Sequence, residues 1–456
     1  MPKPTLTCWG GVGAVTGANF ILDVPQETGS KRLMIDCGLL QGLPGADRTN
    51  AEAFDYDPRS IEAVFITHAH IDHIGKVPKL VKDGFQGTIY STEETKEIAT
   101  LMLLDMAKIS ASNAERYGRE GLYDAHDVEL AMQKWQALPY HSPKDLGGCT
   151  VELFNAGHIL GSAMYKFSFS KGSILFTGDT GSAIAPLEQD IEFPEGVDYL
   201  LMDSVYGDRN HESKEDRDNR FRTALIDAAK AGGTILIPAF SLERTQVLLY
   251  ELDMLFKSKT IPSMPVFLDS PLAIRVTEIY ERFRADYNPA VESEMKNDPD
   301  VFKFPKLMET LDGRDSRNIS AVHGSKIILA GSGMSNAGRI VFHEAVYLPD
   351  PSATIIFAGY QAPGTLGRQI QEGNKTVVID GKHVPVRAQV ISIDGFSAHR
   401  DSDGLVDFVS RVKPSHVFVT MGEPKSSIFL AQRLHDEVHT DTIVPERGKV
   451  YELDLL

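Results

Sequence analysis

The residues with the clearest chemical signature lie in one hexapeptide, His-Ala-His-Ile-Asp-His, at positions 68–73. Four of its six side chains can bind a metal ion: His68, His70, Asp72 and His73. Neutral imidazoles suit Zn²⁺, and a carboxylate beside them suits a second divalent ion or a bound water. In extended backbone, positions i and i+2 project to the same side, so His68 and His70 can share one ion while Asp72 and His73 turn toward a neighbouring position. We therefore predict a metal centre here.

The element that must position this hexapeptide is the segment before it. Residues 61–67 are apolar and β-branched, and a polar loop precedes them. This pattern predicts a buried strand, which places the hexapeptide on the loop that leaves the strand's carboxyl end. Loops held by a rigid scaffold are where binding and catalytic residues concentrate.

Three further candidates fall at similar places along the chain. His158 lies in Asn-Ala-Gly-His-Ile-Leu-Gly-Ser, Asp179 follows an apolar strand and is flanked by glycines, and Asp36 lies in Met-Ile-Asp-Cys-Gly upstream. With the hexapeptide, they resemble in type, spacing and order the metal motifs of the metallo-β-lactamase superfamily. This resemblance implies an α/β fold with a four-layer αββα core.

Composition limits the classes of function. The 456 residues are 42% hydrophobic and 24% charged, which is typical of an ordinary soluble protein with about two to four domains. The net charge of −17 argues against a broad positive field that would bind nucleic acid non-specifically. Three cysteines without paired spacing predict a reducing compartment and no disulfide framework. No signal peptide and no membrane-spanning apolar run is recognised, so we expect a cytoplasmic protein without membrane contact.

The chain divides into three segments that differ in their predicted secondary structure. Residues 1–210 predict a mixed sheet structure with helices outside, including helices at 93–116 and 124–138. In residues 211–378, strands alternate with helices, which predicts an inserted parallel-sheet α/β domain. Residues 379–456 return to strands and helices that we expect to complete the first domain.

The second half narrows the resemblance to the β-CASP branch of the superfamily, which acts on nucleic acids. Asp203, just past a predicted strand, matches the first motif of that branch, and residues 393–399 end in its second histidine, His399. Residues 331–335 and 358–368 are similar to the RNA-specific members. The resemblance covers nearly the whole chain and implies a metal-dependent ribonuclease acting on single-stranded RNA; bacterial-type relatives also suggest a homodimer.

The resemblance also implies roles for the metal-binding residues. The first ion would be held by His68, His70, His158 and Asp179. Asp179 would bridge to a second ion held by Asp72 and His73. Zinc is expected from the ligand type, with manganese as the alternative.

Catalytic and substrate-binding residues follow from the same resemblance. Asp72 would orient the attacking water, and His399, oriented by Asp203, would contact the phosphate and donate a proton. Asp36 would orient a ligand rather than bind metal.

Contacts to the substrate are predicted on the inserted domain. Ser332 and Gly333, on a glycine-rich turn, could hold a phosphate through backbone N–H groups. A local cationic path is predicted from four arginines: Arg244, Arg339, Arg368 and Arg400. Tyr360 could stack on a base, although core packing is the alternative.

Met421 departs from the pattern, since RNA-cleaving relatives have histidine there. A thioether is a poor zinc ligand, so the second ion should be bound more weakly, or a single ion should suffice. The same difference keeps open a DNA-acting enzyme or a catalytically weakened RNA-binding protein. A small-molecule hydrolase on the same core is a further alternative, which the inserted domain argues against.

Overall fold

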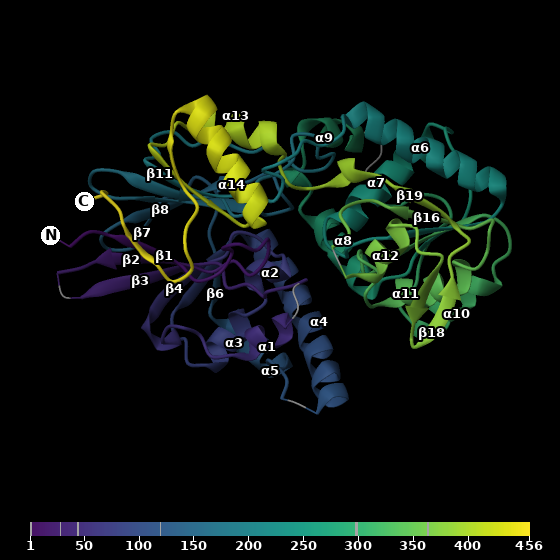
Figure 1. Ribbon diagram of the computed structural model, residues 1–456, viewed down its shortest axis with the longest axis horizontal. Helices are drawn as coiled ribbons and strands as arrows, with labels where there is room; N and C mark the ends of the chain where they lie inside the picture. Colours follow the sequence, from purple (N-terminus) through teal and green to yellow (C-terminus); the bar gives the residue numbers. More distant parts are fainter. Residues whose placement is uncertain (1, 28, 43–44, 119, 297–299, 363) are drawn as a thin grey trace. The chain divides into compact units, whose positions relative to one another are not determined.

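Figure 1 shows the computed structural model, which describes residues 2–27, 29–42, 45–118, 120–296, 300–362 and 364–456. The chain divides into two units. The first contains Met1–Ala183, Glu188–Asn210 and His399–Leu456, and the second contains Ile184–Leu187 and His211–Ala398. The chain therefore re-enters the first unit at His399, later than the expected position 379.

Two seven-stranded sheets form the centre of the first unit (Figure 1). In spatial order the first sheet contains β22 (Val450–Glu452), β1 (Thr5–Cys8), β2 (Phe20–Pro25), β3 (Ser30–Ile35), β4 (Ile61–Phe65), β5 (Thr88–Ser91) and β6 (Trp135–Ala137). The second contains β21 (Asp441–Ile443), β20 (His416–Thr420), β11 (Tyr199–Asp203), β10 (Ser173–Phe176), β9 (Ala163–Ser168), β8 (Thr150–Asn155) and β7 (Lys144–Asp145). Strands β3 to β6 are mutually parallel, and so are β10, β11, β20 and β21.

The inner faces of the two sheets bury one apolar core. Phe65, Phe167 and Phe176 are fully buried within it, and their rings meet edge to face. Helices lie outside the sheets: α1 (Ala46–Ala51), α2 (Ile71–Ile74), α3 (Val77–Lys82), α4 (Glu93–Tyr117) and α5 (Ala125–Gln133) on one side, α13 (Ser402–Val412) and α14 (Pro424–Arg433) on the other. This arrangement confirms the predicted four-layer αββα core (Figure 1).

One predicted helix is shorter than expected. The helix predicted at 124–138 ends at Gln133, and Trp135–Ala137 forms strand β6 instead. Trp135 pairs with Ile89 of β5 and donates from Nε1 to Ser91 Oγ at 2.8 Å. Pairing with an existing sheet edge therefore outweighs the local helical pattern, and an aromatic residue fits a half-buried strand well.

The second unit is built on a six-stranded sheet whose pairings are all parallel. Its spatial order is β14 (Leu307–Glu309), β13 (Val266–Leu268), β15 (Lys326–Ala330), β12 (Thr234–Pro238), β16 (Thr354–Phe357) and β19 (Gln389–Ser392). The helices are α6 (Lys214–Ala231), α7 (Arg244–Lys257), α8 (Pro271–Arg282), α9 (Pro289–Met295), α10 (Gly313–Asn318), α11 (Arg339–Tyr347) and α12 (Leu366–Gln371). A hairpin of β17 (Thr376–Ile379) and β18 (Lys382–Pro385) precedes β19, so residues 379–398 belong to this unit.

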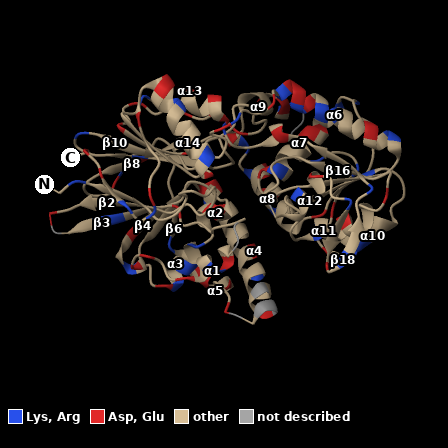
Figure 2. Cartoon of the chain, viewed as in Figure 1, with Lys and Arg blue, Asp and Glu red and all other residues tan. Residues whose placement is uncertain are grey.

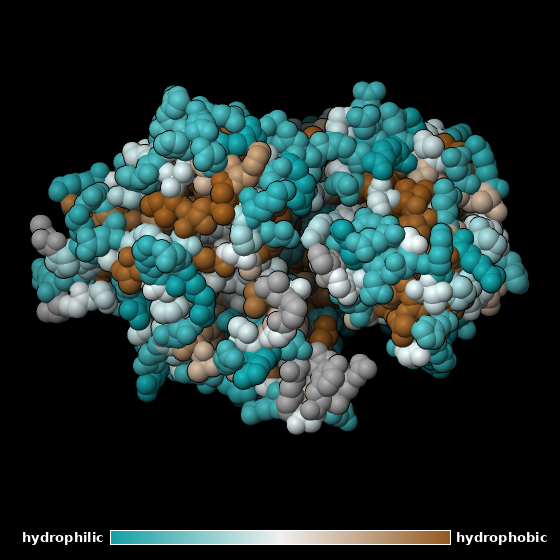
Figure 3. Space-filling model, in the orientation of Figure 1, coloured by the Kyte–Doolittle hydropathy of each residue, from teal (hydrophilic) through white to brown (hydrophobic). Residues whose placement is uncertain are grey.

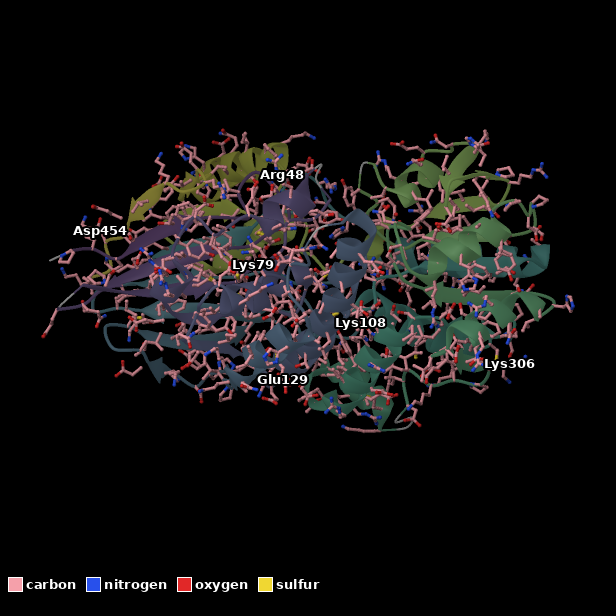
Figure 4. The ribbon with its side chains drawn as sticks, turned by 90° about the horizontal axis from the view of Figure 1, so that it is seen from below. Arg48, Lys79, Lys108, Glu129, Lys306 and Asp454 are labelled. Carbon is pink, nitrogen blue, oxygen red and sulfur yellow. The ribbon has the colours of Figure 1, made fainter. Side chains whose placement is uncertain are left out.

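The surface carries both signs of charge. Acidic and basic side chains are interspersed, for example along α6 (Figure 2), and Arg48, Lys108 and Glu129 are exposed on α1, α4 and α5 (Figure 4). Hydrophobic residues form separate patches on the face shown in Figure 3. Across the described ranges, the structure contains no helix with the length and apolarity needed to span a bilayer.

Candidate metal centre

Four nitrogen and oxygen atoms converge in the first unit. His70 Nδ1 lies 3.1 Å from His68 Nε2 and 3.3 Å from His158 Nε2. Asp179 Oδ2 lies 3.5 Å from His68 Nε2 and 3.6 Å from His158 Nε2. The four sequence-predicted residues of the first ion are thus brought together, and all but His70 are buried.

The donor spacing fits a tetrahedral cation. With bonds of about 2.0–2.1 Å, the ligand atoms of a tetrahedral zinc site lie about 3.3 Å apart. These four separations, between 3.1 and 3.6 Å, match that edge length. Three imidazoles and one carboxylate also form a donor set that zinc prefers. The residues present therefore fit a bound metal ion.

The other oxygen of Asp179 faces a second group. Asp179 Oδ1 lies 3.4 Å from His73 Nε2, and His73 Nε2 lies 3.9 Å from Asp72 Oδ2. Within the described residues, these three side chains do not converge as closely as the first four; the second tight donor cluster is Asp179, Asp203 and His399. The carboxylate of Asp179 therefore lies between two sets of side chains.

Asp36 holds His73 in place. Its Oδ2 lies 2.8 Å from His73 Nδ1 and accepts a hydrogen bond from Thr67 Oγ1 at 2.8 Å, while Oδ1 accepts from the Thr67 backbone N–H at 2.8 Å. A proton on His73 Nδ1 leaves Nε2 to face Asp179. Thr67 also contacts the ring of His68, with Oγ1 3.0 Å from Nδ1. Thr67 was missed by the sequence analysis, although a hydroxyl residue directly before the first histidine was its available signal.

His399 and Asp203 lie beside the same carboxylate. His399 Nδ1 is 3.8 Å from Asp179 Oδ2 and 3.9 Å from Asp203 Oδ2, so this nitrogen lies beyond hydrogen-bond distance of both oxygens. Asp203 Oδ1 accepts from the backbone N–H and hydroxyl of Thr180 at 3.0 and 2.7 Å. Its buried Oδ2 has no hydrogen-bond partner within the described parts of the chain. His399 is about one-fifth exposed, which leaves its ring accessible to a substrate.

Strand ends explain this convergence. His68 to His73 follow β4, Asp36 follows the adjacent parallel β3, and Asp179 and Asp203 stand at the carboxyl ends of the parallel strands β10 and β11. Carboxyl ends of parallel strands meet at one edge of a sheet. Close backbone approach also requires glycine, since a Cβ at Gly38 would lie 1.5 Å from the Asp72 carbonyl oxygen.

Burial and mutual charge perturb the ionisation of these groups. Burial raises the pKa of Asp72 to about 6 and, with the nearby charge of Asp179, that of Asp203 to about 8. Burial lowers the pKa of His68 well below its ordinary value. Burial alone would also lower the pKa of His73, but the carboxylates of Asp179 and Asp36 outweigh it and raise that pKa. Such opposing perturbations are common where proton transfer and metal binding occur.

Met421 does not contribute a donor to either cluster. Its side chain is buried in the apolar core between the two sheets. A Cβ on Gly11 would lie 2.4 Å from the Met421 sulfur and 3.1 Å from the Phe20 ring, so the thioether packs over a glycine backbone. The Met421 N–H donates to the Gly11 carbonyl oxygen at 2.7 Å.

The predicted substrate contacts of the second unit are largely engaged internally. Ser332 Oγ accepts from the N–H groups of Asn336 and Ala337 at 3.2 and 3.3 Å, and its own N–H donates to the Ala337 carbonyl oxygen at 3.1 Å. Arg368 Nε donates to Glu372 at 2.7 Å, with about a third of the arginine side chain exposed. Their role in binding stays a prediction.

The other predicted arginines also have internal partners. Arg244 donates to the Ala358 carbonyl oxygen, and Arg339 donates to Asp269 at 2.7 Å. Arg400 lies in the first unit, where its guanidinium donates to the carbonyl oxygens of Gly181 and Gly404 at 3.2 and 3.0 Å. These guanidinium groups hold loops together, which weakens the predicted cationic path.

Comparison with known proteins places these features in a family. Residues 21–203 match the metallo-beta-lactamase superfamily, residues 245–370 match the Beta-Casp domain, and residues 383–445 match the Zn-dependent metallo-hydrolase RNA specificity domain. The three matches follow the order that the sequence analysis expected.

Individual relatives match over most of the chain. Ribonuclease TTHA0252 of Thermus thermophilus is 32% identical over 93% of this chain and 95% of its own length. Cleavage and polyadenylation specificity factor 73 of Drosophila melanogaster is 30% identical over 94% of this chain, which spans only 62% of that protein. Transcription termination factor FttA of Methanosarcina mazei is 30% identical over 96% of this chain and 70% of its own length.

The fold is also found in a solved structure. The crystal structure of a protein of unknown function from Enterococcus faecalis V583 aligns over 99% of this chain and 100% of its own, with a TM-score of 0.58 and 14% identity. At that identity the likeness concerns the fold alone. With the donor clusters, the ordered domain matches and a 32% identical relative covered over 95% of its length, the chain belongs to the β-CASP family of the metallo-β-lactamase superfamily.

Proposed function

We propose that this protein is a metal-dependent ribonuclease that hydrolyses phosphodiester bonds of single-stranded RNA. The observation that carries the proposal is the donor set of His68, His70, His158 and Asp179, whose atoms lie at the spacing of a tetrahedral zinc site. The match to an RNA specificity domain and the ribonuclease name of a 32% identical relative support RNA as the substrate.

A divalent cation held by these residues would supply charge neutralisation at a phosphoryl oxygen and a lowered pKa for bound water. In our proposal Asp72 orients the attacking water. His399, partly exposed at the rim, contacts the phosphate and protonates the leaving oxygen. Asp203 fixes the loop of Thr180 beside it, and Asp36 fixes the ring of His73.

We further propose zinc as the ion, with manganese as an alternative, and one tightly bound ion per chain. Met421, buried in the apolar core, supports the single tight site because it supplies no donor beside Asp72 and His73. A second ion, which Asp72, His73 and Asp179 would hold, would then bind more weakly. Ser332, Gly333 and Arg368 stay our candidates for contacts with the RNA outside the cleavage site.

The test is cleavage of end-labelled single-stranded RNA, and of DNA with the same sequence, with added Zn²⁺ or Mn²⁺. The Asp72→Ala variant is the control for contaminating nucleases. RNA products that are absent from the control would support the proposal, and their ladder would distinguish internal from terminal cutting. DNA products alone would replace it with a DNA-acting enzyme. Tight RNA binding without products would favour the alternative that the histidine-to-methionine difference at Met421 suggests, a catalytically weakened RNA-binding protein.

The homodimer that the resemblance suggests is also a proposal. Sedimentation velocity at several protein concentrations measures the mass in solution directly. A species of twice the 50.2 kDa chain mass would support the dimer, and a concentration-independent monomer would contradict it.

A further inference from the structure

In the sheet of the second unit, the connections between strands reverse their direction at two adjacent strands. In the order β14-β13-β15-β12-β16-β19, β12 and β15 are neighbours. The chain leaves β12 toward β13 at one side, whereas it leaves β15 toward β16 at the opposite side. Because crossovers between parallel strands are right-handed, these two connections pass over opposite faces of the sheet. The loops after β12 and β15 therefore start from a topological switch point at the carboxyl edge, the kind of place where parallel sheets bind ligands.

An exposed aromatic residue lies at this switch point. Phe240, two residues after β12, keeps 43% of its surface exposed. A Cβ on Gly333, in the loop after β15, would lie 2.8 Å from the Phe240 ring, so the ring rests directly on the glycine backbone. The Phe240 carbonyl oxygen accepts from Thr245 Oγ1 at 2.7 Å and from the Thr245 N–H at 3.2 Å. The backbone of Phe240 is therefore anchored, and its side chain packs on the glycine while much of the residue stays exposed.

A second aromatic residue comes from the next strand. Tyr360 follows β16 and keeps 40% of its surface exposed. Its neighbour Gln361 donates from Nε2 to the Gly333 carbonyl oxygen at 2.9 Å, so the loop after β16 contacts the same glycine as Phe240 does. Arg244 donates to the Ala358 carbonyl oxygen and anchors the base of that loop. Loops from three adjacent strands thus meet at Gly333.

Two serine hydroxyl groups lie at the same carboxyl edge of the sheet. Ser241 Oγ and Ser270 Oγ lie 3.2 Å apart, and both lie within 3.8 Å of the position that a Cβ on Gly331 would take. The guanidinium groups of Arg244 and Arg339 are committed to internal partners. The edge therefore offers exposed aromatic residues with hydroxyl groups beside them.

We propose that this edge of the sheet binds an unpaired nucleobase of single-stranded RNA, stacked on the ring of Phe240, with Tyr360 placed to contact a neighbouring base. Every base has a π-face, so stacking suits an RNA of any sequence, whereas bases inside a duplex are not accessible to such a ring. The identity of the ligand rests on the proposed ribonuclease function. The site itself lies wholly within the second unit and needs no metal.

The test measures binding separately from cleavage. All proteins carry Asp72→Ala, and the probe is a short single-stranded RNA with 2-aminopurine, whose fluorescence falls when the base stacks. Phe240→Ala is compared with Phe342→Ala, a phenylalanine of α11 in the same unit with a similar exposure of 40%. Loss of stacking should weaken binding about five- to hundredfold and abolish quenching in Phe240→Ala alone. Phe240→Trp should restore both, and Tyr360→Ala should have a smaller effect.

Two outcomes separate this site from the proposed function. If wild-type protein cleaves RNA but Phe240→Ala binds as Phe342→Ala does, the stacking site is overturned and the nuclease stands. If quenching depends on Phe240 while wild-type protein cleaves no RNA, the site stands and the nuclease is overturned.

Discussion

Two buried carboxylates, one in each unit, follow strands of their sheets but have opposite surroundings. Asp269, after β13, accepts hydrogen bonds from four side chains at 2.5 to 2.7 Å: Thr310, Ser316, Arg339 and His343. Asp179, after β10, is as deeply buried, yet its nearest side-chain nitrogens are histidine atoms at 3.4 to 3.8 Å. Its buried Oδ1 accepts no hydrogen bond within the described residues.

This difference separates a carboxylate that the protein satisfies from one that it leaves for a ligand. Burial alone would raise the pKa of Asp269, but its four hydrogen bonds outweigh burial and bring that pKa to about 2. A buried charge without such partners is costly, so a native protein retains one mainly where a cation or a substrate completes it. The same reasoning distinguishes a structural network in the second unit from a metal centre in the first.

The largest expected effect comes from Asp179→Asn. An amide keeps the shape but removes the charge from the donor set, so we expect loss of bound metal and cleavage at least about 100-fold slower. The metal-free variant should still fold, because Oδ1 accepts no hydrogen bond within the described residues, but loss of the charge beside His73 should lower its thermal stability below that of metal-free wild type. Metal analysis, RNA cleavage and thermal unfolding measure these three quantities. Asp407→Asn, at an exposed position of the first unit, is the matched control. Retained metal in Asp179→Asn would contradict the view that the Asp179 carboxylate is left for a metal ion.

Asp269→Ala tests the carboxylate of the second unit, whose hydrogen bonds are satisfied by the protein. It leaves Ser316, Arg339 and His343 without their buried acceptor, so we expect a loss of about 3–5 kcal/mol in the free energy of unfolding. Metal content should stay at the wild-type value. Denaturant unfolding followed by metal analysis measures both. Asp227→Ala, which removes an exposed ion pair on α6, should cost less than about 1 kcal/mol; equal losses for the two variants would contradict the assignment.

Glu344 on α11 is a third case, which sharpens the comparison. It is buried with one hydroxyl donor, Ser335, and burial raises its pKa to about 8. Because the folded pKa exceeds the ordinary 4.5, the stability contributed by the bound proton is complete below about pH 4.5 and is lost as pH rises to about 8. Glu344→Gln should therefore gain about 1–3 kcal/mol relative to wild type between pH 5 and pH 8. Unfolding midpoints that differ equally at both pH values would argue against this.

The smallest effect is expected from Met421→His. Position 421 follows β20, whose Thr420 pairs with Asp203 of β11, so an imidazole there would add a nitrogen donor at the edge that carries the carboxylates, and the metal content should rise toward two ions per chain. Met421→Leu preserves the apolar packing over Gly11 and serves as the control, with a cost below about 1.5 kcal/mol. The number of metal ions per chain that remain after dialysis tests this expectation. Equal numbers for both variants would mean that position 421 does not limit binding of the second ion.

Much of the metal centre could be predicted from sequence because its signals are local. His68, His70, His158 and Asp179 stand at strand ends, and the strand pattern of the chain is strong enough to place those ends correctly. The parallel strands β12, β13 and β15 likewise confirm the alternation of strands and helices that was expected for residues 211–378. Features that depend on distant partners could not be found this way, as β6 and the return of the chain at His399 show.

The sequence by itself determined the donor types, their spacing and the parallel sheet that follows, since side-chain chemistry and hydrophobic periodicity act over a few residues. Only the tertiary structure decided which charges are satisfied. The four partners of Asp269, the internal engagement of Arg244 and Arg339, and the burial of Met421 all join residues far apart in the chain. The contact between Phe240 and Gly333 spans two loops in the same way. Such contacts depend on packing between elements, which no local pattern encodes.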